Sequence, residues 1–400
     1  MSFNLISLAR KHFLFLISIL LICALKFSLF PNRSFDISYF LSPWFDFLRS
    51  NGLTAFSYPF NNYNPPYTFL IYISTLFTNN SVYGIKLISF VFDFIFAYYS
   101  MKIVDFYRPN IKQISFLAAF ASPILIINSS LWGQCDVIYA TFILICIYKF
   151  LKDEIYWAMF GFAIAFTFKF QTMFFLPVLV YLLFSKYIKI NQLYRICLIF
   201  VATFLVPLLL PVLFGRPVFS SRIYDFYNPE GVLNIYLNQM NTQNQLVLYS
   251  VPTLYNWIPN TFFKLFYPNV FLFAFSIVGI FLWVLTKLEL NYLRIKSELL
   301  RISLLLTTVF IFLLPKMQER YFFLPTSLAV IYTLIYPKKW WVAVMIYIPC
   351  MFGEFRGAVT YTGQVPFIAQ SYWGALTVIV AIIFLGIDIV VENRKNKIIS

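Results

Sequence analysis

The chain has 400 residues, of which 61% are hydrophobic and only 11% are charged, and its formal net charge is +15. Because soluble domains carry about a quarter charged residues, this composition excludes an ordinary soluble globule and predicts a polytopic membrane protein. Basic loops on the cytoplasmic side account for the positive charge. The sequence has no phosphate-binding loop, zinc-ligand spacing or nucleic-acid motif, so we expect no nucleic-acid partner.

Cysteine and histidine usage bears on cofactors. The five cysteines are scattered, mostly inside apolar runs, which is typical of small core residues rather than of a disulfide or metal framework. His12 is the single histidine, which excludes a histidine-rich metal site. We therefore expect no metal and no other cofactor.

The first apolar run follows a basic N-terminus. Arg10 and Lys11 stand before it and no small-residue cleavage site follows, which predicts an uncleaved first span. Hydropathy and the positive-inside rule together predict an all-α single domain, residues 1–400, with about twelve spans and both termini in the cytoplasm. The expected spans are residues 13–30, 82–104, 113–131, 137–150, 156–169, 171–185, 194–214, 268–286, 299–315, 321–336, 340–352 and 367–389.

The first external loop, residues 31–81, is the first part of the chain that must face water. Within it, residues 43–50 form an amphipathic stretch that Ser42-Pro43 can begin and Asn51-Gly52 can end, which predicts a short interfacial helix. The segment 65–77 gives roughly 20 Å of helix against a hydrocarbon core of about 30 Å. We therefore expect it to be a re-entrant or surface-lying helix.

Three carboxylates receive different interpretations. Asp46 falls in the first turns of the short helix, where its charge favours the helix dipole, so we expect a structural role. Asp36 either caps a turn that begins at Ile37 or acts as a general base at the membrane surface. Asp93 lies in the middle of span 82–104, so we expect it to face the bundle interior and to have a partner there.

Two of the later spans predict a hollowed outer face. Spans 156–169 and 171–185 are joined only by Phe170, so the turn at Lys169 lies slightly below the outer surface. A charge at that depth costs about 2.5–3.5 kcal/mol unless it meets water or a partner. Polar side chains are therefore expected to line the hollow.

The long external loop 215–267 is expected to cover this hollow. It contains an Asn/Gln-rich stretch at 238–245, which is either a sugar-recognition segment or a plain solvated loop.

WGQCD at 132–136 lies at the outer mouth of span 137–150. Trp132 is expected in the aromatic belt of the membrane interface, and Gly133 allows a close approach. Gln134 and Asp136 are polar groups at a span end, for which simple snorkelling to water is the structural alternative.

In this topology the polar motifs all share the outer side, and such convergence at a recessed surface indicates a functional site. The motifs are Asp36, NNYNPPY at 61–67, WGQCD at 132–136, FKFQ at 168–171, PKMQER at 315–320 and GEFRG at 353–357. Lys316 and Arg320 suit a lipid phosphate at the outer leaflet, whereas an ion pair of either with Glu319 is the structural alternative.

The order of these motifs resembles the GT-C superfamily of polyprenyl-phosphate-sugar-dependent glycosyltransferases, and most closely the bacterial relatives of the second mannosyltransferase of glycosylphosphatidylinositol assembly. The resemblance covers about residues 30–335. It rests on DISYFLSPW at 36–44, NYNPPYTFL at 62–70, WGQCD at 132–136, FKFQTMFFLP at 168–177 and LPKMQERYFFLP at 314–325. One position departs from the family, because Gln318 stands where His usually precedes Glu-Arg, which leaves the role of that position and the donor sugar open.

The resemblance implies a GT-C-like bundle that transfers a sugar, mannose first, from a polyprenyl-phosphate donor to a glycan or lipid-linked acceptor with inversion. Asp36 is the implied general base, since such a displacement needs a base opposite the leaving phosphate and positive charge on that phosphate. Lys316 and Arg320 are the implied phosphate ligands, with Lys169 a lesser candidate. The remaining implied substrate-binding residues are Asn64, Tyr63, Gln134, Asp136, Gln171 and Glu319. The implied location is a bacterial inner membrane, in contact with membrane lipid, with the site facing the periplasm, or a lumen in a eukaryote.

Two alternatives stay open. An O-antigen-type polysaccharide polymerase would use catalytic arginines in two external loops, for which Arg216, Arg222 and Arg356 are candidates. A lipid-linked oligosaccharide flippase or other transporter would place charged residues through the membrane midplane, with access from both sides.

Overall fold

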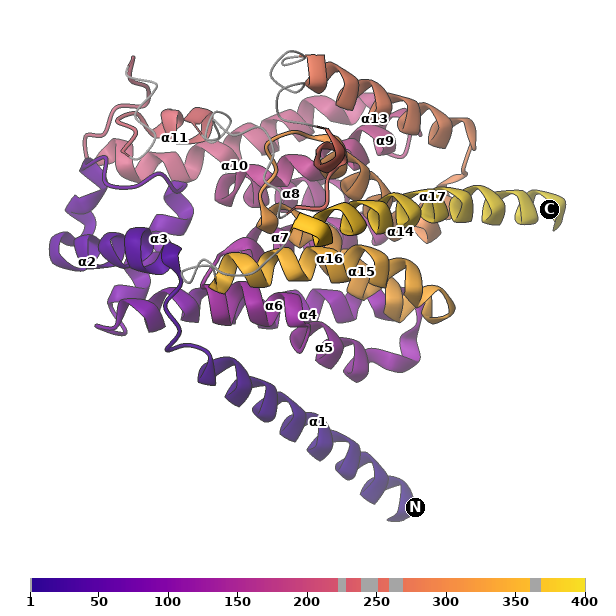
Figure 1. Cartoon of the computed structure of the whole chain (residues 1–400), viewed down its shortest axis with the longest axis horizontal. Coiled ribbons are helices and arrows are strands. Elements are labelled where there is room, and N and C mark those ends of the chain that lie inside the picture. Colours follow the sequence, from indigo (N-terminus) through magenta and orange to yellow (C-terminus); the bar gives the residue numbers. More distant parts are fainter. Residues whose placement is uncertain (1, 222–227, 239–250, 259–268, 360–367, 400) are drawn as a thin grey trace.

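The computed structural model describes residues 2–221, 228–238, 251–258, 269–359 and 368–399, and every element of secondary structure in these ranges is helical (Figure 1). Within these ranges, six helices are long and apolar enough to cross a membrane: Ser81–Tyr107, Pro109–Trp132, Ile190–Leu213, Asn269–Lys287, Pro337–Val359 and Tyr372–Asn393. Three shorter apolar helices are His12–Ser28, Ile155–Phe168 and Phe170–Phe184. The all-α class is confirmed and fits an integral membrane protein, whereas the count of twelve spans is not.

The N-terminal third contains a long first helix, the loop with its short helices, and a second long helix. These elements are α1 (Ser2–Ser28), η1 (Ile37–Leu41), α2 (Ser42–Asn51), η2 (Gly52–Ser57), α3 (Pro65–Thr75) and α4 (Ser81–Tyr107). Figure 1 shows the N-terminal end of α1 leading away from the body of the molecule, while α2 and α3 follow its C-terminal end. In α2, Trp44, Phe45 and Leu48 are buried while Asp46 is exposed, as the amphipathic pattern predicts. The helix ends at Gly52, whose φ of 59° is the left-handed conformation that glycine favours.

The predicted span 113–131 corresponds to the candidate span Pro109–Trp132, whose helix is interrupted before Pro123. The elements here are η3 (Pro109–Ile111), α5 (Lys112–Phe120), α6 (Pro123–Leu125), η4 (Ile126–Trp132) and α7 (Asp136–Leu151). The break falls before Pro123, which has no backbone N–H to continue α5. η4 is a π-helix. This form is rare in proteins overall, and where it occurs it often lies at a functional site.

The middle of the chain runs through α8 (Ile155–Phe168), η5 (Phe170–Phe175), α9 (Leu176–Phe184), η6 (Ile190–Gln192) and α10 (Leu193–Leu213). The expected tight turn is present, since Lys169 alone, in an extended conformation, separates α8 from η5. The elements α11 (Val232–Asn238) and η7 (Leu254–Trp257) lie within the segment expected as the large external loop. Arg222 and most of the Asn/Gln-rich stretch, residues 239–245, lie outside the described residues.

The C-terminal part consists of α13 (Asn269–Lys287), α14 (Tyr292–Leu313), η8 (Glu319–Phe322), α15 (Phe323–Ile335), η9 (Pro337–Lys339), α16 (Trp340–Val359) and α17 (Ile368–Ile399). The expected span 340–352 ends too early, because GEFRG at 353–357 is not an external loop after it but forms the last turns of α16. The physical reason is burial: Glu354 is fully buried and Gly357 packs on an indole ring, so this segment continues as a helix into the protein.

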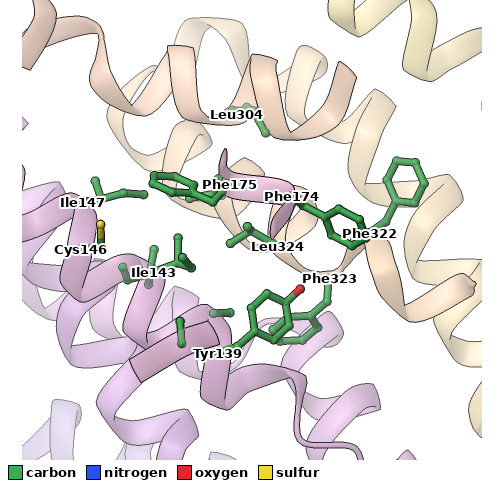
Figure 2. Close-up of a cluster of buried hydrophobic side chains, with 14 of the residues drawn as sticks. Tyr139, Ile143, Cys146, Ile147, Phe174, Phe175, Leu304, Phe322, Phe323 and Leu324 are labelled. Atoms are coloured by element: carbon green, nitrogen blue, oxygen red, sulfur yellow. The ribbon is translucent and has the colours of Figure 1, made fainter. Parts of the chain in front are cut away.

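A buried apolar cluster joins α7, η5, α14 and η8. Figure 2 shows Tyr139 of α7, Phe174 and Phe175 of η5, Leu304 of α14 and Phe322 at the end of η8 gathered around one core. Each lies within six residues of a polar group at the end of its helix, except Leu304. Packing at interior density leaves these helix ends little freedom, so the polar groups that they carry are held in fixed positions.

Two polar regions occupy opposite ends of this bundle. The opposite-end ion network is made by the beginning of α14, η9 and the end of α17, where Arg301 lies 3.2 Å from Glu298 and 3.3 Å from Asp388. Lys339 also pairs with Asp388. Because α14 runs from this network to the turn before η8, the polar groups of η8 lie at the other end of the bundle.

Asp93 has the partner that its midspan position predicts. Its carboxylate accepts hydrogen bonds from Lys26 of α1 at 2.8 Å and from Ser129 of η4 at 2.6 Å, and both charged side chains are fully buried. This pair fastens α1 to the bundle.

Candidate functional site

Asp36 lies at the start of the π-helix η1, half-buried, and makes no capping bond to η1. Its Oδ2 instead accepts hydrogen bonds from the indole Nε1 of Trp132, at 2.9 Å, and from Nε2 of Gln134. The capping alternative is therefore wrong, and the carboxylate is held by two neutral donors rather than by a cation. The expected belt position of Trp132 is also wrong, because its side chain is buried against Asp36 and α16.

Gln134 links Asp36 to a guanidinium group. Its Oε1 accepts hydrogen bonds from Nη1 of Arg320, at 2.7 Å, and from the hydroxyl of Tyr63, at 3.2 Å. One buried amide thus donates to the carboxylate with its nitrogen and accepts from the guanidinium with its oxygen. We call the row Asp36, Gln134 and Arg320 the amide-bridged row.

Arg320 has further neutral partners. Its Nε donates to Oε1 of Gln318 at 3.1 Å and its Nη1 donates to the Tyr63 hydroxyl at 3.2 Å. Burial acts to lower the pKa of Arg320, but Tyr63 and Asp36 outweigh it and leave the pKa raised, so the group is a permanent cation. Burial, opposed by Arg320, raises the pKa of Tyr63 to about 12, so that this hydroxyl keeps its proton.

Backbone anchors set the positions of the two loops that carry Asp36 and Gln134. The ammonium of Lys86 in α4 is fully buried and donates to the carbonyls of Leu29, Phe30, Asn32 and Leu131 at distances from 2.7 to 3.2 Å. One helical turn later, Ser89 donates to the carbonyl of Gln134 at 2.7 Å. α4 therefore clamps both loops. Lys86 was not among the sequence candidates, although a lysine inside an apolar span was a usable signal.

Gly133 makes this close approach possible. Its φ of 82° is in the left-handed region, and a Cβ there would meet the side chain of Ile37 at 2.4 Å. Glycine alone fits this position, which joins the Asp36 segment to the loop before α7.

A second row of polar groups starts at the recessed turn after α8. The ammonium of Lys169 lies 2.5 Å from Oδ1 of Asp136, and both residues are buried. The amide nitrogen of Asn128 donates to Oδ2 of Asp136 at 3.1 Å and to Oε2 of Glu354 at 2.9 Å. Asn128 and Glu354 were missed as site residues. Their signals were an Asn-Ser-Ser run inside an apolar span and a carboxylate near the end of another.

The two rows adjoin each other. Lys169 and Asp36 both act electrostatically on Tyr63, and Arg320 acts on Glu354. Cys135 lies between them and is buried, and burial raises the pKa of its thiol to about 11, as for an unreactive core cysteine.

The other predicted substrate-binding residues lie on the same elements. Asn64 is buried at the start of α3, where its carbonyl accepts from the N–H groups of Tyr67 and Thr68. Burial raises the pKa of the Tyr321 hydroxyl overall, although Gln171 in η5 lies close enough to act in the opposite direction and lower it. Lys316 and Glu319 lie in the turn from α14 into η8 that carries Arg320.

That turn is conformationally unusual. Lys316 has a φ of 61°, which is uncommon for a residue other than glycine and occurs often at functional sites. From this turn it is Arg320 that enters the amide-bridged row, while neither Lys316 nor Glu319 takes part in the bonds of that row described above.

Within the described ranges, no group of three or more His, Cys, Asp or Glu side chains is placed to hold a metal ion. The chemistry open to these residues is that of a half-buried carboxylate, a fixed guanidinium and several hydrogen-bond donors. No protein-family model, curated protein or solved structure matches the chain.

Proposed function

We propose that this protein is a membrane glycosyltransferase that moves a sugar from a polyprenyl-phosphate carrier to an acceptor hydroxyl. The observation that carries the proposal is the amide-bridged row, in which Gln134 holds a carboxylate and a guanidinium apart. An inverting displacement needs these two groups on either side of the reacting carbon. The base receives the proton of the acceptor, and the cation meets the departing phosphate.

The proposed reaction is a single displacement. The acceptor hydroxyl gives its proton to the carboxylate of Asp36 while its oxygen forms a bond to the anomeric carbon. The bond between that carbon and the phosphate oxygen breaks, and its electron pair stays with the polyprenyl phosphate. The guanidinium of Arg320 stabilises this phosphate as its charge develops, with charge-assisted hydrogen bonds that neutral donors cannot match.

Of the three phosphate ligands implied by the sequence, Lys316, Arg320 and Lys169, the proposal assigns the main role to one. Lys169 already has the carboxylate of Asp136 at 2.5 Å, so its charge is largely neutralised. Arg320 makes its described hydrogen bonds to the neutral oxygens of Gln134, Tyr63 and Gln318. In this proposal Arg320 is the main phosphate ligand, and Lys169 orients Asp136.

The donor and acceptor follow from the family resemblance. The sugar is a hexose, mannose first, and the acceptor is a glycan or a lipid-linked glycan. By the positive-inside rule, the site faces the periplasmic side of a bacterial inner membrane, with both termini in the cytoplasm.

The polymerase alternative is less well supported at Arg216, one of its three candidate arginines. The guanidinium of Arg216 is buried and donates to the backbone carbonyls of Pro229 and Glu230, so it holds the chain after α10 in place. Burial lowers the pKa of Arg216 to about 10, which still leaves it charged. Its contacts explain it as a structural residue.

The test is Asp36→Asn, with Asp46→Asn as the matched control, because Asp46 is an exposed carboxylate ten residues away. Membranes with each variant are assayed with a panel of radiolabelled polyprenyl-phosphate sugars. We expect wild type and Asp46→Asn to transfer one sugar, and Asp36→Asn to lose on the order of 10²–10⁴ in rate while inserting normally. If Asp36→Asn is as active as wild type, the base assignment is wrong. If wild type uses no donor, the polymerase and flippase alternatives take precedence.

A further inference from the structure

The end of α16 touches both rows of the site through residues that the proposed reaction leaves without a role. Glu354 reaches the row of Lys169 through Asn128. Gly357, one turn further on, lies against the indole of Trp132, which donates to Asp36. We call Glu354 and Gly357 the α16 strut.

The Glu354 contact is fully buried and chemically specific. Glu354 has no exposed surface, and its Oε2 takes a hydrogen bond from the same amide nitrogen that donates to Asp136. Losing an acceptor at such a place leaves a buried donor poorly satisfied, so the amide would turn or shift. Asp136 would then lose one of its two fixed partners, and Lys169 would lose the fixed position of its carboxylate.

The Gly357 contact is steric. A Cβ at this position would lie 2.2 Å from the ring atom Cη2 of Trp132 and 2.7 Å from Cζ2. Real Cβ atoms essentially never come this close, so a side chain at 357 must push the indole away. The indole Nε1 would then leave its 2.9 Å contact with the carboxylate of Asp36.

We propose that the α16 strut positions the site, with Glu354 aligning the substrate-binding candidate Asp136 through Asn128, and Gly357 aligning the base Asp36 through Trp132. This inference rests on the proposed glycosyl transfer. It predicts that two residues one turn apart on one helix control different steps. Glu354 affects binding of the donor through Asp136, and Gly357 affects the proton transfer that accompanies the chemical step.

The experiment measures kcat and KM for the donor in purified full-length variants of known thermal midpoint. We expect Glu354→Leu to raise KM about tenfold with kcat within about twofold, because the lost interaction acts in binding. Glu354→Gln keeps an acceptor oxygen and retains most of the wild-type activity. Asn128→Ala, on the same row, reproduces the rise in KM, and it serves as the second variant if Glu354→Leu does not fold.

On the other row, we expect Gly357→Ala to lower kcat about tenfold with little change in KM, since a displacement of about 1 Å at a reacting group is enough for such a loss. Trp132→Phe removes the same N–H donor, so the double variant Gly357→Ala with Trp132→Phe falls no further than Trp132→Phe alone. Phe355→Leu is the matched control on the same helix, since Phe355 is exposed and lies between the two strut residues.

The outcomes separate the two levels of inference. If Glu354→Leu and Gly357→Ala lower the same parameter in proportion to lost folded protein, the strut is only structural and the proposal is wrong. If Glu354→Gln is as poor as Glu354→Leu, the hydrogen-bond role of Glu354 is wrong. If wild type transfers no sugar, the proposed function fails and the strut proposal fails with it.

Discussion

The two polar ends of the helix bundle are built on different rules. In the opposite-end ion network, carboxylates meet cations directly, as Asp388 meets Arg301 and Lys339. The site end has one such direct pair, Lys169 with Asp136, but amide groups stand between its other charges, since Gln134 separates Asp36 from Arg320 and Asn128 separates Asp136 from Glu354. Direct pairs neutralise each other and fasten helices together. Charges held apart by amides keep most of their interaction energy for a ligand.

A cost argument supports this distinction. Removing one partner of a buried ion pair typically destabilises a protein by 3–5 kcal/mol, because the other charge is left uncompensated. Arg301, Glu298 and Asp388 are all at most one-sixth exposed. The network is thus a stabilising device, and the site end is where charge is kept available.

The largest expected effect comes from Arg320→Met. The substitution removes the cation of the amide-bridged row, so we expect kcat/KM to fall by about 10²–10³. The hydrogen bonds that are lost with the guanidinium go to neutral oxygens only, so we expect little change in thermal midpoint. kcat/KM is measured by sugar transfer from the donor that wild type uses, and the thermal midpoint is measured by a melt in detergent. Arg49→Met is the control, because Arg49 is exposed and bonds only a loop carbonyl among its described contacts. A melt lowered as strongly as activity would show that Arg320 is structural.

An intermediate effect is expected at the other end, from Arg301→Met. This change leaves Glu298 without its described cation and takes one of two cations from Asp388, so we expect about 3 kcal/mol of lost stability and a clearly lower thermal midpoint. The rate per folded molecule should stay close to that of wild type. A large drop in that rate with an unchanged melt would remove the distinction between the two ends.

The smallest effect concerns Asp153, an exposed carboxylate near the same end that accepts hydrogen bonds from Lys296 and Tyr292. Burial acts to raise the pKa of Asp153, but these two hydrogen bonds outweigh it and lower the pKa. A lowered pKa in the folded state stabilises above the unfolded pKa of about 3.9, and this contribution is lost as the pH falls through the folded value. Exposed pairs contribute at most about 1 kcal/mol. We therefore expect Asp153→Asn to lower the thermal midpoint slightly at pH 6 and by less at pH 3. An equal decrease at both values would contradict the assignment.

The sequence predicted which elements carry the site residues, but it did not predict which side chains contact each other. The polar motifs carry Asp36, Gln134 and Arg320, and the structure brings these three side chains together. The partner of Asp93 was expected from its depth in an apolar span, but its identity as Lys26 depends on how α1 packs, which no local pattern encodes. The catalytic and binding roles of Asp36, Gln134 and Arg320 stay predictions.

The misses share a physical cause. Hydropathy treats a span as a continuous helix, whereas α5, α6 and η4 form a broken one because Pro123 interrupts it and a π-helix follows. Because hydropathy is averaged over many residues, the polar Asn128 was overlooked in an apolar run. For the same reason the predicted end of α16 came too early. Tertiary contacts with buried polar groups decide these local structures, and such contacts are not visible in composition or periodicity.

The most direct test of the comparison is Gln134→Glu, with kcat/KM and the thermal midpoint measured on the same preparation. A glutamate here would pair with Arg320 directly and would give the site end the ion-paired pattern of the opposite end. The account predicts a loss of activity of about tenfold or more, because Arg320 is neutralised and Asp36 loses its amide donor to a second carboxylate, while the melt falls by much less than in Arg301→Met. Full activity in this variant, or a melt that falls in step with activity, would contradict the claim that amide-separated charges are what makes this end functional.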